Sequence, residues 1–170
     1  SFLKNNSRFI VISVSFSLLT KPNLHVNYGD VAQRLSTLTN PTPFDLRNII
    51  INIRQSKLPD PEILGNAGSF FHNPIVSKNI AQQLLSKHPN IPLFPTPDPE
   101  KIKVSAGWLI DSLGLKGLRK GNVGIYQEHA LVIVNYGGSY QAELLEFANG
   151  IQSQIKEHYD IALNIEPIIL

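Results

Sequence analysis

Proline and glycine clusters divide the chain into short segments, and this division constrains the fold more than any other feature of the sequence. The 170 residues include 12 prolines and 11 glycines. A residue that precedes proline avoids the helical region, so each such step favours a turn or an extended piece. Residues 89–101 contain five prolines and are predicted to be a loop. Helix and strand patterns alternate irregularly between the clusters, which predicts a mixed α+β fold rather than a regular βαβα array.

Composition excludes several classes of protein. The chain has no cysteine, which excludes disulfide bonds, Cys-ligated zinc, iron–sulfur clusters and thiol nucleophiles. Its 15 Lys+Arg and 13 Asp+Glu give a net charge of +2, too even for a chain built around nucleic acid or a membrane surface. The longest apolar stretch, from Phe9 to Leu19, is shorter than the roughly 20 residues that span a bilayer. We therefore expect a soluble, cytoplasmic chain that binds neither nucleic acid nor membrane.

Periodicity and capping residues predict the elements between the breaks. Residues 9–18 are predicted to form a strand, because after Ile12 apolar residues alternate with serine, which is the period of a half-buried strand. Further strands are expected at 123–126, 130–136 and 161–170. Helices are expected at 43–56, 78–87, 106–113 and 140–159, each after a residue that can cap its first turn. These caps are Thr42, Ser77, Ser105 and Ser139.

Short motifs in the sequence are weak by themselves. Neither a phosphate-binding loop nor a dinucleotide fingerprint is present, and no pair of histidines has the spacing of a zinc-binding helix, so no metal site is expected. Gly65 and Gly68 form only a G-x-x-G pattern, for which a structural turn is the favoured interpretation. Residues 114–124 form a basic, glycine-rich segment with two open interpretations, a flexible connection or a contact to phosphate or carboxylate.

Three sequence blocks resemble one known family. The first is Lys-Leu-Pro-Asp-Pro at 57–61 followed by Gly-Asn-Ala-Gly-Ser-Phe-Phe-His-Asn-Pro at 65–74. The second is Ser-Ala-Gly-Trp-Leu-Ile-Asp at 105–111 with Gly-Leu-Lys-Gly at 114–117, and the third is His-Ala-Leu-Val-Ile-Val-Asn at 129–135. In this order they resemble the UDP-N-acetylenolpyruvoylglucosamine reductase (MurB) family. The resemblance covers essentially the whole chain but only the second half of the family's length.

The resemblance implies an FAD-dependent oxidoreductase of peptidoglycan precursor synthesis, and hence a role in cell wall biogenesis, cell shape and cell division. NADPH would be the reductant, and UDP-GlcNAc-enolpyruvate would be converted to UDP-N-acetylmuramate. The flavin would carry the hydride chemistry, while the protein supplies positioning and charge. The full-length protein is expected to be a monomer. An alternative from another class stays open, an inactive nucleotide-sugar-binding fragment without flavin.

The resemblance also implies roles for individual residues. Ser69 would be the acid that protonates the substrate carbon, and Glu166 would polarise the substrate carboxylate. Because a hydroxyl is a poor acid, Ser69 would need neighbours that stabilise its alkoxide. Gly68 would contact the cofactor. The substrate-binding residues implied in the same way are Tyr28, Lys57, Asn73 and His129.

Two departures from the family pattern affect these assignments. The family usually has Leu-Glu-x-Glu-Val where this chain has Leu-Asn-Ile-Glu-Pro at 163–167. A gapless comparison places Glu166 at the catalytic position, whereas a shifted register would place Ile168 there. We prefer the gapless register because it retains the acid. His72 stands where relatives commonly carry lysine.

The resemblance further divides the chain into three parts. Residues 1–58 would complete an FAD-binding α+β domain, residues 59–158 would form an α/β substrate-binding domain, and residues 159–170 would return to the first domain. The family's glycine-rich flavin loop and catalytic arginine would precede Ser1, and a glycine would follow Leu170. We therefore expect that the chain alone neither holds FAD firmly nor turns over.

Overall fold

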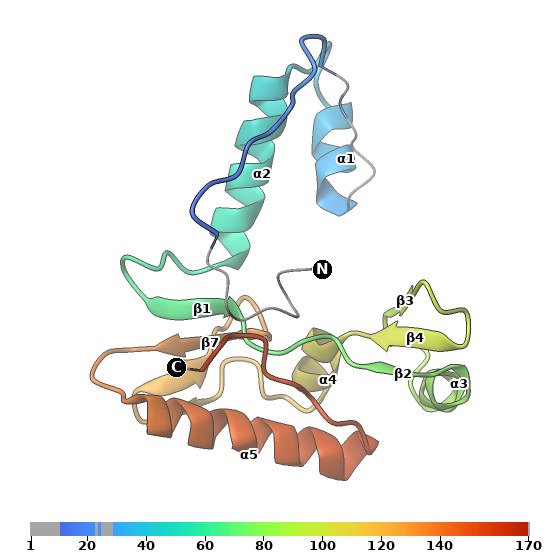
Figure 1. Ribbon diagram of the computed structural model, residues 1–170, viewed down its shortest axis with the longest axis vertical. Helices are drawn as coiled ribbons and strands as arrows, with labels where there is room; N and C mark the ends of the chain where they lie inside the picture. The colour runs from blue at the N-terminus through green and yellow to red at the C-terminus, as the bar shows by residue number, and fades with distance from the viewer. Residues whose placement is uncertain (1–10, 23, 25–28, 170) are drawn as a thin grey trace. The chain divides into compact units, whose positions relative to one another are not determined.

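The computed structural model describes residues 11–22, 24 and 29–169 (Figure 1). The chain divides into two compact units, a first unit Ser1–Ile51 and a second unit Asn52–Leu170. The described residues form helices and two antiparallel sheets, which confirms the α+β class. Because both sheets are antiparallel, α+β rather than α/β also describes residues 59–158.

The first unit contains helix α1 (Gly29–Ser36) and most of helix α2 (Pro43–Lys57). The predicted cap of α2 is confirmed, because Thr42 Oγ1 accepts a hydrogen bond from the Asp45 N–H at 3.3 Å. The Asp45 carboxylate in turn accepts from the Thr42 hydroxyl at 2.6 Å and from its N–H at 2.9 Å. These bonds lower the pKa of Asp45, the side-chain bond more than the backbone bond. The two residues therefore form a reciprocal cap.

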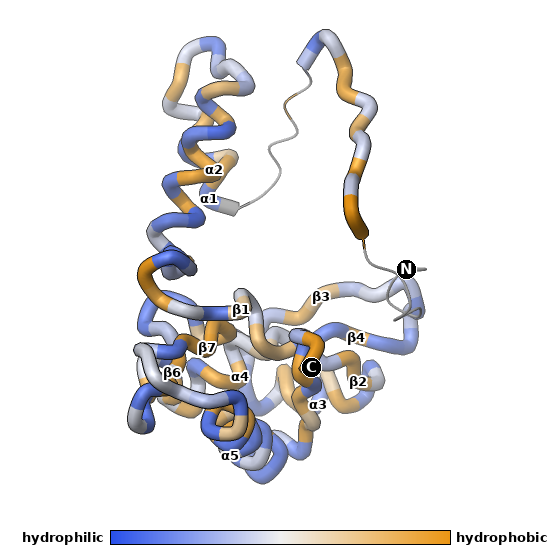
Figure 2. Tube along the Cα trace, turned by 60° about the vertical axis from the view of Figure 1, so that its left-hand side comes forward, coloured by the Kyte–Doolittle hydropathy of each residue, from blue (hydrophilic) through white to orange (hydrophobic). Residues whose placement is uncertain are grey.

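One prediction for the first unit was wrong and one helix was missed; residues 9 and 10 of the predicted strand lie outside the described residues. Residues 11–18 of the predicted strand have no regular secondary structure, and Figure 2 shows their alternation of apolar and polar residues along an irregular path. A period-two pattern forms a strand only beside a neighbouring strand, and the described residues of this unit contain none. Helix α1 was not predicted, although Val31 and Leu35, four residues apart, are its buried positions.

The first sheet of the second unit has the strand order β1-β7-β6-β5. Its strands are β1 (Gly65–Ser69), β7 (Val132–Asn135), β6 (Val123–Ile125) and β5 (Arg119–Lys120). The two strands predicted at 123–126 and 130–136 are confirmed as β6 and β7 with slightly shorter bounds. Val132, Ile133 and Val134 are all buried, as expected for an interior strand covered on both faces. Helices α4 (Ala106–Ser112) and α5 (Gln141–Tyr159) contribute to the same hydrophobic core.

The second sheet has the order β2-β4-β3, with helix α3 (Lys78–Lys87) against it (Figure 1). Its strands are β2 (Ile75–Ser77), β4 (Lys101–Val104) and β3 (Leu93–Pro95). The loop predicted at 89–101 therefore contains a short strand. Pro95 is accommodated because β3 lies at the edge of the sheet, where a missing N–H leaves no ladder bond unmade.

The sequence predicted a cap for each of three helices in the second unit, and two of these predictions are confirmed. The side chains of Ser77 and Ser105 cap α3 and α4 as predicted. The prediction of Ser139 was wrong, because α5 begins one residue later, with Tyr140 at the cap position. The Glu143 carboxylate accepts the Tyr140 N–H at 3.1 Å, so an acid in the first turn supplies the cap bond.

The strand predicted at 161–170 is reduced to one isolated bridge, between Ile165 and Phe71. Pro167 follows it and has no N–H to continue a ladder. Ile161 and Leu163 are buried in the core, so the segment is held by side chains more than by strand pairing. The single bridge nevertheless determines where Glu166 lies.

Candidate functional site

Strand β1 ends in a bulge that presents Ser69. Asn66 pairs with Val134 and Ser69 with Val132, so the register shifts between them. The Asn66 side chain holds this bulge, since it donates to the Leu64 carbonyl at 2.9 Å and accepts the Gly68 N–H at 3.0 Å. Gly68 has φ +69°, a conformation that glycine adopts without steric cost. The bulge leaves the Ser69 side chain exposed, where a ligand can reach it.

The C-terminal segment runs alongside the residues that follow Ser69. The Glu166 N–H donates to the Phe70 carbonyl at 2.9 Å, and the His72 N–H donates to the Asn164 carbonyl at 2.9 Å. Phe70 is 2% exposed and anchors this pairing in the core. Glu166 therefore contacts, through its backbone, the residue directly after Ser69.

The turn that contains His129 lies on the other side of the same backbone. The Phe70 N–H donates to the Leu131 carbonyl at 2.7 Å, and Ser69 pairs with Val132 in the sheet. His129 is half-buried, and its Nδ1 accepts the Leu131 N–H at 3.2 Å. Residues 69 and 70 thus pass between the His129 turn and the segment that carries Glu166.

Lys57 acts electrostatically on His129. Burial lowers the pKa of His129 below its ordinary value of 6.5, and the positive charge of Lys57 lowers it further. Both effects disfavour the protonated imidazole, so His129 is neutral at neutral pH. The lysine at the end of α2 therefore lies close enough to influence the group beside Ser69.

Asn73 occupies a structural position. Its side-chain oxygen accepts the Ala106 N–H at 2.8 Å, while Ser105 Oγ accepts the Trp108 N–H at 3.2 Å. Asn73 thereby ties the segment after β1 to the first turn of α4, and this oxygen is engaged within the chain.

The remaining predicted site residues are Tyr28, Gly68 and the two candidates for the C-terminal position, Glu166 and Ile168. Tyr28 lies outside the described residues. Gly68 adjoins Ser69, and an added Cβ there would meet nothing within 4 Å. Ile168, the residue of the shifted register, is 86% exposed, whereas Glu166 is bonded to Phe70. The choice between the two registers stays a prediction.

The basic, glycine-rich segment is a hairpin built from β5 and β6. Lys116 pairs with Asp111 at 3.1 Å, and the Arg119 guanidinium carbon lies 3.9 Å from the centre of the Tyr136 ring. Each cation has a partner within the chain. Residues 119–120 and 123–125 form paired strands, so this part of the segment is a regular hairpin, while residues 114–118 are the turns that connect α4 to it.

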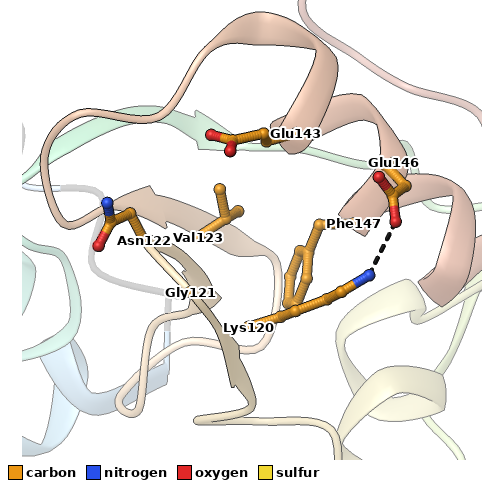
Figure 3. A pocket seen from close by; sticks show the side chains of 7 residues that line it. All are labelled: Lys120, Gly121, Asn122, Val123, Glu143, Glu146 and Phe147. Atoms are coloured by element: carbon orange, nitrogen blue, oxygen red, sulfur yellow. Dashed lines mark hydrogen bonds and ion pairs between the residues drawn. The ribbon is translucent and has the colours of Figure 1, made fainter.

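A hollow of about 230 Å³ lies beside this hairpin (Figure 3). Lys120 bridges to Glu146 at 2.8 Å, and this lysine lowers the pKa of Glu146 through its hydrogen bond and its charge. Phe147 and Val123 line the hollow, and none of the expected site residues does. The hollow is therefore distinct from the arrangement around Ser69.

Sequence reasoning missed two residues of the site. Asn66 shapes the bulge, and its signal was the Asn-x-Gly spacing typical of a side chain that bonds its own backbone two residues on. His72 Nδ1 lies 3.4 Å from Glu166 Oε2. No local pattern indicates that contact, because the two residues are far apart in the sequence.

The described residues lack both a metal-binding cluster and a membrane-spanning helix. They hold no group of three or more histidine or acidic side chains arranged for a metal ion. Within the same residues, no helix combines the length and the apolar character needed to cross a membrane.

Comparison with known proteins identifies this α+β domain. Residues 60–170 match the C-terminal domain of UDP-N-acetylenolpyruvoylglucosamine reductase. The chain therefore belongs to the MurB family and corresponds to its C-terminal part.

Curated relatives extend the match to the whole chain. The reductase of Chromobacterium violaceum is 44% identical over 165 residues, which cover 96% of this chain and 48% of that protein. The reductase of Xylella fastidiosa is 42% identical, with 97% and 48% covered, and that of Polynucleobacter asymbioticus is 43% identical, with 99% and 49% covered. The chain thus spans about half the length of these relatives.

Proposed function

We propose that the chain is the substrate-binding and proton-donating half of a reductase that converts UDP-GlcNAc-enolpyruvate to UDP-N-acetylmuramate, with NADPH as reductant and FAD as cofactor. The observation that carries the proposal is the position of Ser69 and Phe70 between the Glu166 segment and the His129 turn. The similarity to reductases over nearly the whole chain supports it. The proposal places the protein in the cytoplasm, in peptidoglycan synthesis, with the full-length enzyme a monomer.

Ser69 donates the proton in this proposal. An ordinary hydroxyl is a poor proton donor, so its alkoxide must be stabilised by nearby positive charge or hydrogen-bond donors. Lys57 supplies such a charge, since it acts on His129 in the turn next to Ser69. His129 stays neutral beside it, so the same turn can offer a hydrogen bond to substrate without adding a competing charge.

Glu166 acts on the substrate carboxylate in this proposal. Its side chain is half exposed, and its backbone is fixed to Phe70, directly after the proton donor. In this proposal the two groups act on a common substrate from neighbouring backbone positions. Asn73 contributes indirectly, by holding α4 against the segment that follows Ser69.

The described residues fit FAD only in part. No atom lies within 4 Å of a Cβ added at Gly68, so the backbone next to Ser69 is open to a ligand there. The sequence contains no glycine-rich dinucleotide fingerprint, so we place the contacts to the cofactor diphosphate in the half of the family's length that the chain does not cover. When bound, the reduced flavin would supply the hydride. In the same proposal, residues 1–58 complete the flavin domain, residues 59–158 bind substrate, and residues 159–170 return to the flavin domain.

The test is Ser69→Ala in a complete reductase that contains this chain as its second half. We expect turnover to fall by a factor of about 100 to 10,000, the usual contribution of a general acid, while substrate affinity is retained. Ser86→Ala is the matched control, since Ser86 is exposed on α3 and bonds only its own helix. If Ser69→Ala keeps the turnover of the control, Ser69 is not the proton donor.

A second measurement separates the reductase from the inactive binding fragment. The complete protein should show flavin absorbance after purification and should oxidise NADPH when substrate is added. Substrate binding without bound flavin, and without NADPH oxidation when FAD is added, would favour the fragment.

A further inference from the structure

We infer that His72 positions the Glu166 carboxylate beside Ser69, an inference that rests on the proposed function. The observation is the contact of 3.4 Å between His72 Nδ1 and Glu166 Oε2. Nothing in the sequence around either residue indicates this contact.

The backbone holds the two side chains together. The His72 N–H bonds the Asn164 carbonyl, the Glu166 N–H bonds the Phe70 carbonyl, and the Phe71–Ile165 bridge lies between these bonds. Phe71 is 1% exposed, so the segment from which His72 projects is anchored in the core. The backbone hydrogen bonds therefore fix the two positions from which the His72 and Glu166 side chains reach each other.

The contact contributes little to stability. The His72 and Glu166 side chains are 35% and 49% exposed, and ion pairs of this kind at the surface stabilise a protein only weakly. A glutamate side chain has several rotatable bonds, whose freedom is lost when it is held for catalysis. The effect of His72 is therefore to restrict the directions that the Glu166 carboxylate samples and to leave its second oxygen for substrate.

The chemistry at position 72 needs a donor that can bond a carboxylate and can carry a positive charge, because hydrogen bonds between charged groups are the stronger ones. Histidine offers a ring N–H, and lysine offers an ammonium with three donors. Glutamine keeps a donor of similar polarity but cannot carry a charge. His72→Lys should therefore preserve the positioning, whereas His72→Gln should weaken it.

The first experiment tests the contact in the 170-residue chain. The ring nitrogen signals of His72 are recorded by ¹⁵N NMR with and without the substitution Glu166→Gln. We expect the His72 signals to shift and those of His158, exposed on the last turn of α5, to stay unchanged. Unchanged His72 signals would overturn the inference.

The second experiment tests the effect on turnover in the complete reductase. We expect His72→Gln to lower kcat by up to about 100-fold, the effect of misplacing a reacting group by about 1 Å, with the KM for NADPH unchanged. His72→Lys should restore kcat, and His158→Gln should have no effect. The double variant with Glu166→Gln should be no slower than Glu166→Gln alone, because residues that act as a unit are not additive.

Two failures are distinguishable. If Glu166→Gln lowers kcat but His72→Gln does not, the positioning role of His72 is refuted and the proposed function stands. If Glu166→Gln itself leaves kcat unchanged, the role of Glu166 in the proposed function is refuted, and the positioning role of His72 is refuted with it.

Discussion

The two units of this chain bury their apolar residues to very different degrees. In the first unit, Val31 and Leu35 are the buried apolar residues within the described part, and no residue of α2 is buried. In the second unit, two sheets and three helices surround a core whose central side chains, such as Ile125 and Ile155, are fully buried. A helix gains most of its stability from packing of its apolar face. The second unit therefore has the core of an independent domain, and the described residues of the first unit do not form one.

Exposed apolar residues on α2 accompany this contrast. The chain spans about half the length of its curated relatives, and the apolar residues Phe44 and Ile50 of α2 remain 66% and 40% exposed. Exposed apolar surface of this kind is typical of sites where another element or protein packs. The site around Ser69 therefore lies in the unit that has its own core.

The largest test of the contrast is a pair of isoleucine substitutions. Ile151→Ala removes a side chain that is 1% exposed and should lower the free energy of unfolding by about 2–5 kcal/mol. Ile50→Ala, at a position 40% exposed on α2, should change it by less than about 0.5 kcal/mol. Urea unfolding followed by far-UV circular dichroism measures both. Equal losses of unfolding free energy at the two positions would contradict the difference in packing between the two units.

A glycine pair tests how tightly the second unit is packed at its hairpin. A Cβ at Gly124 would lie 2.8 Å from the Leu118 carbonyl oxygen and 3.2 Å from the Tyr136 ring, so Gly124→Ala should destabilise by about 1–3 kcal/mol. Gly150 lies in α5 with nothing within 4 Å of such a Cβ. Gly150→Ala should therefore stabilise by about 0.5–1 kcal/mol. Thermal unfolding measures the change in stability of each variant. If Gly124→Ala leaves the stability unchanged, the hairpin shifts easily to make room for the added methyl group.

A tyrosine pair tests a polar link between α4 and α5. The Tyr159 and Ser112 hydroxyls lie 2.7 Å apart, and Ser112 donates its own hydrogen to the Leu109 carbonyl, so Tyr159 is the donor between them. Tyr159→Phe should cost about 0.5–1.5 kcal/mol. Tyr140, 79% exposed, provides the control, since Tyr140→Phe should be neutral. Equal denaturation midpoints for the two variants would show that the link contributes nothing.

The smallest expected effect is the pH dependence that His129 confers. Its pKa in the folded chain is lowered by burial first and by Lys57 second, so the unfolded chain binds the proton more readily. The resulting stability is fully present above the ordinary value of 6.5 and is lost as the pH falls through that value toward the folded pKa. His129→Gln should reduce the loss of stability between about pH 7.5 and about pH 5.5.

Lys57→Gln sharpens the same prediction. Removing the charge should raise the pKa of His129 part of the way toward its ordinary value. The pKa should not return to that value, because burial is the larger cause of the lowering. An NMR titration of the His129 ring measures this directly. A pKa that does not move would show that Lys57 lies too far away to act on the site.

Local chemistry made much of the second unit predictable from sequence. Ser77 and Ser105 cap their helices as their positions indicate, and the apolar run around Val132 and Val134 is the interior strand that it suggests. The cap of α5 was misplaced because Glu143 bonds the Tyr140 N–H, and a serine at the preceding position looks equally suitable. Local rules thus predict elements well and their ends less well.

The remainder depends on contacts that no local rule describes. The alternation at residues 11–18 is a strand pattern, but a strand also needs a neighbour. Within the candidate site, family resemblance indicates Ser69 and Glu166, while only the folded chain brings His72 to Glu166 and engages Asn73 with Ala106. Local sequence patterns therefore do not predict the contacts between distant segments.

The single bridge between Phe71 and Ile165 has a consequence for the order in which the site matures during synthesis. A ribosome completes the bulge around Ser69 long before it reaches Glu166, and folding proceeds broadly from the N-terminal side. Almost the whole second unit must be closed into a loop before the carboxylate can dock, and such closure costs entropy. Ser69 is therefore synthesised and placed in the sheet before the Glu166 carboxylate can dock beside Phe70.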